Sequence, residues 1–149
     1  MAGAGRVWAA AQEGEAVIQQ PAGRDAAALW AAYTTGEKPL CLLDTHYRHM
    51  ERQYHNFDFD LDGQEKQLEQ LIVKARQRYM AVGAKLAERF LTQYRQAGFK
   101  LPGALRQREI FTRHVKPALA QGKTAYVWVD ALRFEMGREL AQTLAAEYE

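Results

Sequence analysis

The sequence predicts a mainly α-helical protein that ends in one strand and one helix. Two observations carry this prediction. Large apolar residues recur every three or four positions over long stretches, and one short run rich in β-branched and aromatic residues lies near the end of the chain. We expect a helical pre-domain over residues 1–122 and the first β-α unit of an α/β domain over residues 123–149.

The composition is that of a globular protein. Apolar residues make up 48% of the chain and charged residues 26%, which is enough for a sizeable core. No apolar stretch approaches the roughly 20 residues needed to cross a bilayer, and residues 1–23 lack the pattern of a secretory signal. We therefore expect a cytoplasmic protein without a membrane partner. The single cysteine, Cys41, lies among leucines and is expected to be a small buried thiol.

The first half of the chain predicts two helices. Residues 1–24 hold small residues and turn formers, and no element is predicted there. Asp25 is expected to cap a helix that runs to about Tyr33. The next helix carries five large apolar residues at spacings of four and three: Leu43, Tyr47, Met50, Tyr54 and Phe57.

The longest predicted element runs from about residue 64 to residue 97, which would make a helix about 50 Å long. Its apolar residues fall within a narrow arc at 100° per residue: Leu68, Ile72, Ala75, Tyr79, Val82, Leu86 and Phe90. Because this helix and the one before it both carry such stripes, we expect them to pack as an antiparallel pair, a long helical hairpin.

The last third of the chain predicts helix, strand and helix. A helix is expected over residues 104–120, and Pro117 should bend its last turn because it cannot donate to the carbonyl of Arg113. Residues 125–129 are expected to form the strand. The final helix, from about Phe134 onward, repeats the apolar residues Met136, Leu140 and Leu144. No stop signal follows it, as in a truncated product.

Residues from Asp58 to Glu69 match the spacing of an EF-hand calcium loop between two helices. Against calcium binding, Glu65 stands where such loops usually carry an aliphatic residue, and no second loop is present. The alternative is a helix connection in which Asp62 caps the long helix and Glu65 completes a capping box. A calcium-binding helical protein therefore remains one hypothesis.

Three histidines on or near one helix suggest a metal site: His46, His49 and His55. Their spacing is not a known ligand signature, because two histidines three positions apart need a positioned third ligand to bind zinc. We interpret them as exposed surface histidines.

Basic residues concentrate in one segment. Residues 74–116 contain eleven Lys or Arg against two acidic residues. Four of these cations fall on one face of the long helix: Lys74, Arg78, Lys85 and Arg89. Such a face can follow a phosphate backbone, and the alternatives are a solvated surface or an acidic protein partner. A non-enzymatic interaction module that binds nucleic acid is therefore a second hypothesis.

Asp130 directly follows the predicted strand. Ligands in α/β folds gather beyond the carboxyl ends of the strands, so this carboxylate is a candidate metal ligand. Asp is also a good N-cap, and Asp130 could equally cap the final helix. The local residues leave both interpretations open.

The block around Asp130 resembles the PglZ family, which belongs to the alkaline phosphatase superfamily and occurs in bacterial BREX phage-defence systems. The resemblance runs from Leu101 to Leu144 and is clearest in residues 109–111, 115–119 and 125–140, the last of which contain Asp-Ala-Leu-Arg-Phe-Glu. The preceding helical region, including Leu43-Asp44 and residues 85–90, looks more loosely like the segment before the PglZ domain.

The resemblance implies that Asp130 is the metal-binding aspartate of a metal-dependent phosphatase or phosphodiesterase-type enzyme, with zinc as the expected cation. Such a metal acts as a Lewis acid on a phosphoryl oxygen. The family's Ser or Thr nucleophile and its other Asp and His ligands follow this region and are absent from the sequence. We therefore expect an inactive fragment, truncated after the first β-α unit and binding no metal alone. Arg133 and Glu135 also match the block, and other defence-system proteins are the implied partners.

Overall fold

The computed structural model describes residues 2–57, residue 63 and residues 65–147. These residues are mainly helical, as the sequence predicts. The elements in chain order are α1 (Ala2–Gln19), the 3₁₀ turn η1 (Pro21–Arg24), α2 (Ala26–Thr34), α3 (Leu42–His55), α4 (Glu65–Gln96), α5 (Gln107–Ile110), the π-helical turn η2 (Phe111–Val115), α6 (Lys116–Gln121) and α7 (Phe134–Glu147). Within the described residues, no helix is long and apolar enough to cross a membrane.

The N-terminal segment is a helix, although no element was predicted there. Helix α1 packs against both α3 and α4, which contact each other much less than either contacts α1. Its buried residues are small and follow helical spacing: Ala4, Val7, Ala11 and Gly14. The sequence prediction relied on large apolar residues, so it overlooked a helix whose buried face is narrow.

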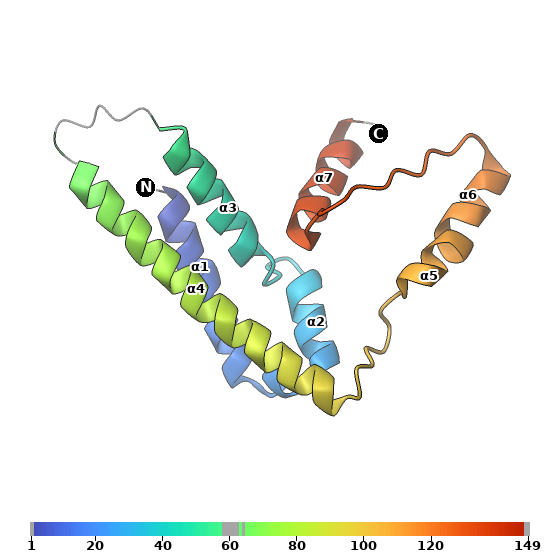
Figure 1. Cartoon of the computed structure of the whole chain (residues 1–149), viewed down its shortest axis with the longest axis horizontal. Coiled ribbons are helices and arrows are strands. Elements are labelled where there is room, and N and C mark those ends of the chain that lie inside the picture. Colours follow the sequence, from blue (N-terminus) through green and yellow to red (C-terminus); the bar gives the residue numbers. More distant parts are fainter. Residues whose placement is uncertain (1, 58–62, 64, 148–149) are drawn as a thin grey trace.

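The long helical hairpin is confirmed. Helix α3 runs antiparallel to α4, and α1 runs in the same direction as α4 (Figure 1). The predicted stripes meet in the shared core, where Met50, Ile72 and Val82 are almost completely buried. Tyr47 and Tyr79 stack with their ring centroids 3.8 Å apart. We call α1 to α4 the helical body.

Helix α2 begins as predicted. The Asp25 carboxylate accepts hydrogen bonds from the backbone N–H groups of Ala27 and Ala28, at 3.2 and 3.1 Å. This N-cap satisfies two of the donors that the first helical turn leaves unpaired. Leu29 is buried, while 41% of the neighbouring Trp30 is exposed.

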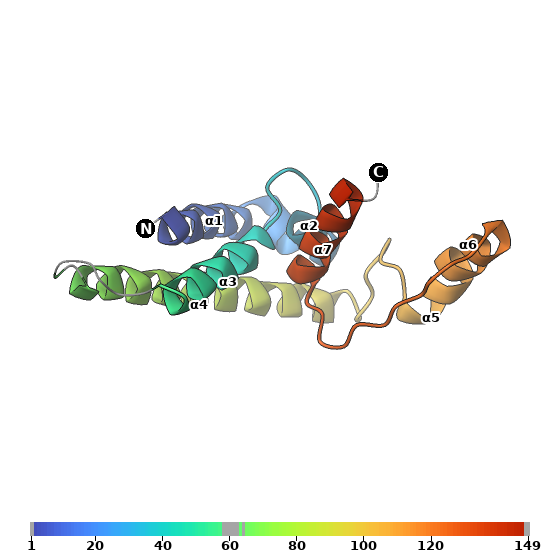
Figure 2. The same ribbon diagram turned by 90° about the horizontal axis from the view of Figure 1, so that it is seen from above.

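The predicted helix over residues 104–120 is shorter and interrupted. In α5, η2 and α6 the backbone is helical from Gln107 to Gln121, but η2 is wider, with the Lys116 N–H donating to the carbonyl of Phe111. Pro117 lies directly after this turn and cannot donate to Arg113, so the wider turn accommodates the proline. Figures 1 and 2 show this segment standing away from the helical body.

Residues 123–129 run as a stretched loop between α6 and α7 (Figures 1 and 2) and form no strand, which corrects the prediction for residues 125–129. A strand needs a neighbour with which to exchange backbone hydrogen bonds. The described part of the chain contains no second strand, so these residues cannot form a sheet despite their high β propensity.

Helix α7 begins at Phe134, as predicted, and returns to the helical body beside α3 (Figures 1 and 2). Of its predicted apolar side, Met136 is partly buried, whereas Leu140 and Leu144 are each nearly half exposed. The residue of α7 that is buried is Glu135.

Two glycines in α1 allow a matched test of the close packing between α1 and α4. A Cβ at Gly14 would lie 3.0 Å from a Val82 methyl group, whereas a Cβ at Gly5 would meet nothing within 4 Å. We expect Gly5→Ala to stabilise the protein by about 0.5–1 kcal/mol through helix propensity. Gly14→Ala should gain measurably less in urea unfolding, because steric crowding offsets that benefit. Equal gains would contradict the packing of α1 on α4.

Candidate functional site

Asp130 lies in a turn on the surface. It follows the extended run and is exposed, and its Oδ1 accepts a hydrogen bond of 2.8 Å from the Ala131 N–H. Ala131 has a φ of 54°, a left-handed conformation that is strained for a residue with a side chain. The solvent-facing Asp130 carboxylate is therefore next to a strained residue, Ala131, whose conformation must be stabilised by its surroundings.

Asp130 does not cap α7, so that alternative is wrong. The first backbone hydrogen bond of α7 runs from the Gly137 N–H to the carbonyl of Arg133, at 3.0 Å. Arg133 therefore occupies the N-cap position, three residues beyond Asp130. Among the described residues, the Asp130 carboxylate accepts one hydrogen bond, from the Ala131 N–H of its own turn.

The run before Asp130 exposes its apolar side chains. Val127 is 74% exposed and Trp128 is 70% exposed, although the Tyr126 and Trp128 rings lie 5.0 Å apart. Exposed apolar groups in an extended segment are favourable sites for pairing with another strand. This segment has the apolar composition of a buried strand, but no neighbouring strand lies beside it among the described residues.

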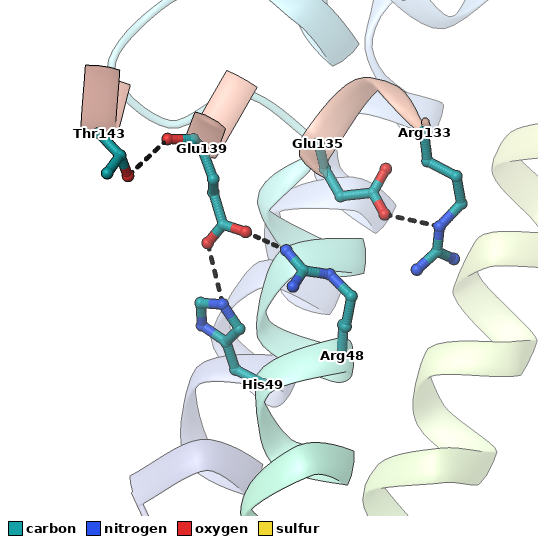
Figure 3. Close-up of polar contacts among 6 residues, drawn as sticks. All are labelled: Arg48, His49, Arg133, Glu135, Glu139 and Thr143. Atoms are coloured by element: carbon teal, nitrogen blue, oxygen red, sulfur yellow. Dashed lines mark hydrogen bonds and ion pairs between the residues drawn. The ribbon is translucent and has the colours of Figure 1, made fainter. Parts of the chain in front are cut away.

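Glu135 is buried, with 2% of its surface exposed, and Arg133 provides the nearby positive charge. The Arg133 Nε lies 3.0 Å from the Glu135 Oε1 (Figure 3). This contact lacks hydrogen-bond geometry, so that oxygen has no hydrogen bond among the described residues. A buried carboxylate is costly without a compensating charge, and Arg133 supplies that charge.

Glu139, one turn further along α7, contacts two basic side chains of α3. Its Oε2 pairs with Arg48, and its Oε1 lies 2.9 Å from the His49 Nε2 (Figure 3). These partners are 91 and 90 residues away in the sequence, which explains why sequence reasoning missed them. Glu139 lies within the PglZ-like block, but nothing in its local pattern indicated a partner on α3.

Asp44 joins three helices beneath the start of α7. Its two carboxylate oxygens accept hydrogen bonds from the hydroxyls of Tyr33 and Tyr79, at 2.9 and 2.8 Å. Burial, with the neighbouring Asp44 charge, raises the pKa of both phenols well above the usual value. Both hydroxyls therefore stay protonated and act as donors. The Phe134 ring lies 5.8 Å from the ring of Tyr33.

Two open hollows lie on the helical body. One of about 550 Å³ is largely apolar and lies between α2, α3 and α4, with Trp30, Met80 and Phe90 in its lining. The other, of about 780 Å³, lies where the first turn of α1 meets the end of α3 and the start of α4. Asp130 lines neither of these two hollows.

The histidines fall into three different environments. His55 is largely exposed and lies beside Glu51, and His49 contacts Glu139. His46 is partly buried, and desolvation, with the nearby charges of Arg6 and His49, lowers its pKa. Residues 2–57, 63 and 65–147 contain no group of three or more His, Cys, Asp or Glu side chains placed to hold a metal.

The basic face of α4 is partly neutralised. Both terminal nitrogens of Arg78 donate to the Glu15 carboxylate, at 2.9 and 2.6 Å. Arg78 also lies over the Trp8 ring, 5.3 Å from its centroid, while the Lys85 Nζ lies 4.0 Å from Glu15. Sequence reasoning missed this pairing because it predicted no helix in the segment that carries Glu15.

The other sequence predictions have separate outcomes. Cys41 is completely buried, as expected, and burial raises the pKa of its thiol. The EF-hand pattern lies largely outside the described residues, since Asp58, Asp60 and Asp62 are not among them. Calcium binding there stays a prediction.

Comparisons with protein-family models, with curated proteins and with solved structures find no match to this chain.

A partly buried ion pair between α3 and α4 makes stability depend on pH. Arg76 donates to both oxygens of Glu51, at 2.7 and 2.8 Å, and these hydrogen bonds lower the pKa of Glu51 below its usual 4.5. The folded state therefore binds this proton less tightly than the unfolded chain does. The resulting stabilisation is present above about pH 4.5 and is lost as the pH falls through the folded-state pKa.

We expect Glu51→Gln to destabilise the protein near neutral pH and to remove this part of the pH dependence. Urea unfolding from about pH 7 to about pH 3 should show the wild type and the variant converging as the pH falls. Glu88→Gln changes an exposed position of α4 and is the matched control. A constant gap between wild type and Glu51→Gln across this range would contradict the assignment.

Proposed function

We propose that this chain is part of a PglZ-like, metal-dependent phosphatase or phosphodiesterase-type protein, acting in the cytoplasm in bacterial phage defence. The sequence support is the block over residues 125–140. The structural observation that supports it best is the placement of Asp130, an exposed carboxylate at the end of an extended apolar run. A ligand at the end of the first core strand would need that position.

The residues around Asp130 fit one ligand of a metal site, because a carboxylate oxygen binds zinc well. A bound cation would supply Lewis-acid stabilisation to a phosphoryl oxygen. Within this proposal Asp130 donates one oxygen ligand, and the turn at Ala131 orients it. Three or four ligands per metal are needed, so we infer no hydrolytic activity for the 149 residues alone.

The test uses the longest protein that the gene encodes, with the 149-residue chain in parallel. We expect zinc-dependent hydrolysis of bis(4-nitrophenyl) phosphate or 4-nitrophenyl phosphate by the longer protein only. Asp130→Asn should lower that rate by at least about 100-fold and lower the zinc content, since it removes a charged ligand. Glu147→Gln, an exposed carboxylate on α7, is the control. Unchanged zinc content and activity in Asp130→Asn would refute the assignment.

A second candidate function is that of a helical module that binds nucleic acid. Lys74, Lys85 and Arg89 are exposed on the same helix, which favours this possibility. Arg78 is engaged by Glu15, so it contributes to the packing of α1 and less to the free charge of this face.

We expect Lys74→Glu, Lys85→Glu and Arg89→Glu together to abolish any retention on DNA or RNA columns, with binding by the wild type weakening steeply as salt rises. Arg78 is left unchanged so that the fold is preserved, as circular dichroism would verify. Retention that is equal for wild type and the triple variant would exclude this face as the binding surface.

A further inference from the structure

The helix that follows Asp130 is fastened to the helical body mainly through charged residues. Glu135 and Glu139 are four positions apart and therefore lie on one face of α7, the face that approaches α3. The apolar residues Leu140 and Leu144 remain nearly half exposed. Leu140 and Leu144 thus contribute little to the position of α7, which depends on the polar contacts together with the packing of Phe134 on Tyr33.

We propose that Arg48, His49 and Glu139 form a clamp that docks α7 on α3, and that Arg133 and Glu135 are positioning residues for Asp130. The role assigned to Asp130 rests on the proposed function, whereas the docking itself does not. The helical body is then the platform that holds the Asp130 block in place.

The clamp has the geometry of a specific contact. Each oxygen of Glu139 has its own nitrogen partner, in the Arg48 guanidinium or the His49 ring, and the three side chains are only 26–41% exposed. Partial burial reduces screening by water and salt, so this contact is stronger than an ion pair on an open surface. Two donors on successive residues of α3 also determine the rotation of α7 about its axis.

Few residues separate Glu139 from Asp130, and three of them, residues 133–135, make contacts that fix their positions. Glu135 is buried with Arg133 against it, and Phe134 packs on Tyr33, which in turn donates to Asp44. The left-handed turn at Ala131 lies two residues before Arg133, the first of these anchors. A strained residue of this kind persists only where its surroundings over-determine the backbone.

Hydrogen exchange of the 149-residue chain tests the clamp. Glu139→Gln should speed the exchange of the α7 amides by about tenfold or more, while α1 and α4 exchange as in the wild type. Glu147→Gln makes the same chemical change on the exposed side of α7 and should have no effect. Glu139→Arg should release α7, and adding Arg48→Glu should restore part of its protection, because it reverses both charges of the Arg48–Glu139 pair but leaves His49 without its carboxylate partner.

The positioning role has its own readout, the NMR resonance of the Ala131 amide, which donates to Asp130. Glu135→Gln should shift that resonance and leave the amides of α1 and α4 in place. The proposal is overturned if Glu139→Gln exchanges like Glu147→Gln, if the charge reversal fails to rescue, or if Ala131 is unmoved in Glu135→Gln. None of these measurements depends on hydrolysis, so the zinc-dependent assay can fail or succeed independently.

Discussion

The close approach of α1 to α3 and α4 is the constraint on which the rest of the structure depends. Val7 and Ala11 are completely inaccessible to solvent, and Gly14 lets α1 lie against the side chain of Val82. Small residues make this approach possible, because larger ones would hold the three helices apart. The same packing brings Glu15 to Arg78, so it also decides how much charge the basic face of α4 retains.

Asp44 connects the helical body to the start of α7 through its hydrogen bond from Tyr33, whose ring contacts Phe134. Its carboxylate receives one tyrosine hydroxyl from α2 and another from α4, so the three helices meet at a single charged group. Hydrogen bonds to a charged acceptor are stronger than neutral ones, and partial burial strengthens them further. Phe134 packs on the same tyrosine of α2, which places the start of α7 beside a rigid part of the helical body.

The accuracy of the sequence predictions follows the strength of the local signal. Helix α4 was predicted to within a residue or two, because its apolar arc is continuous. The N-terminal helix was missed, because its buried face consists of alanine, glycine and one valine. The expected strand did not form: its residues favour the extended conformation, but a sheet requires partners that the described chain lacks. Asp130 does not cap α7, and its role as a metal ligand stays a prediction.

The sequence by itself determined helices α2, α3, α4 and α7 and the Asp25 cap. Local spacing and backbone preference are sufficient for these features, because they involve residues within a turn or two of one another. Only the tertiary structure decided that α7 presents Glu135 and Glu139 to the helical body, and that Arg48 and His49 receive Glu139. Contacts between residues some 90 positions apart depend on how the helices pack, and no local pattern of charges specifies that arrangement.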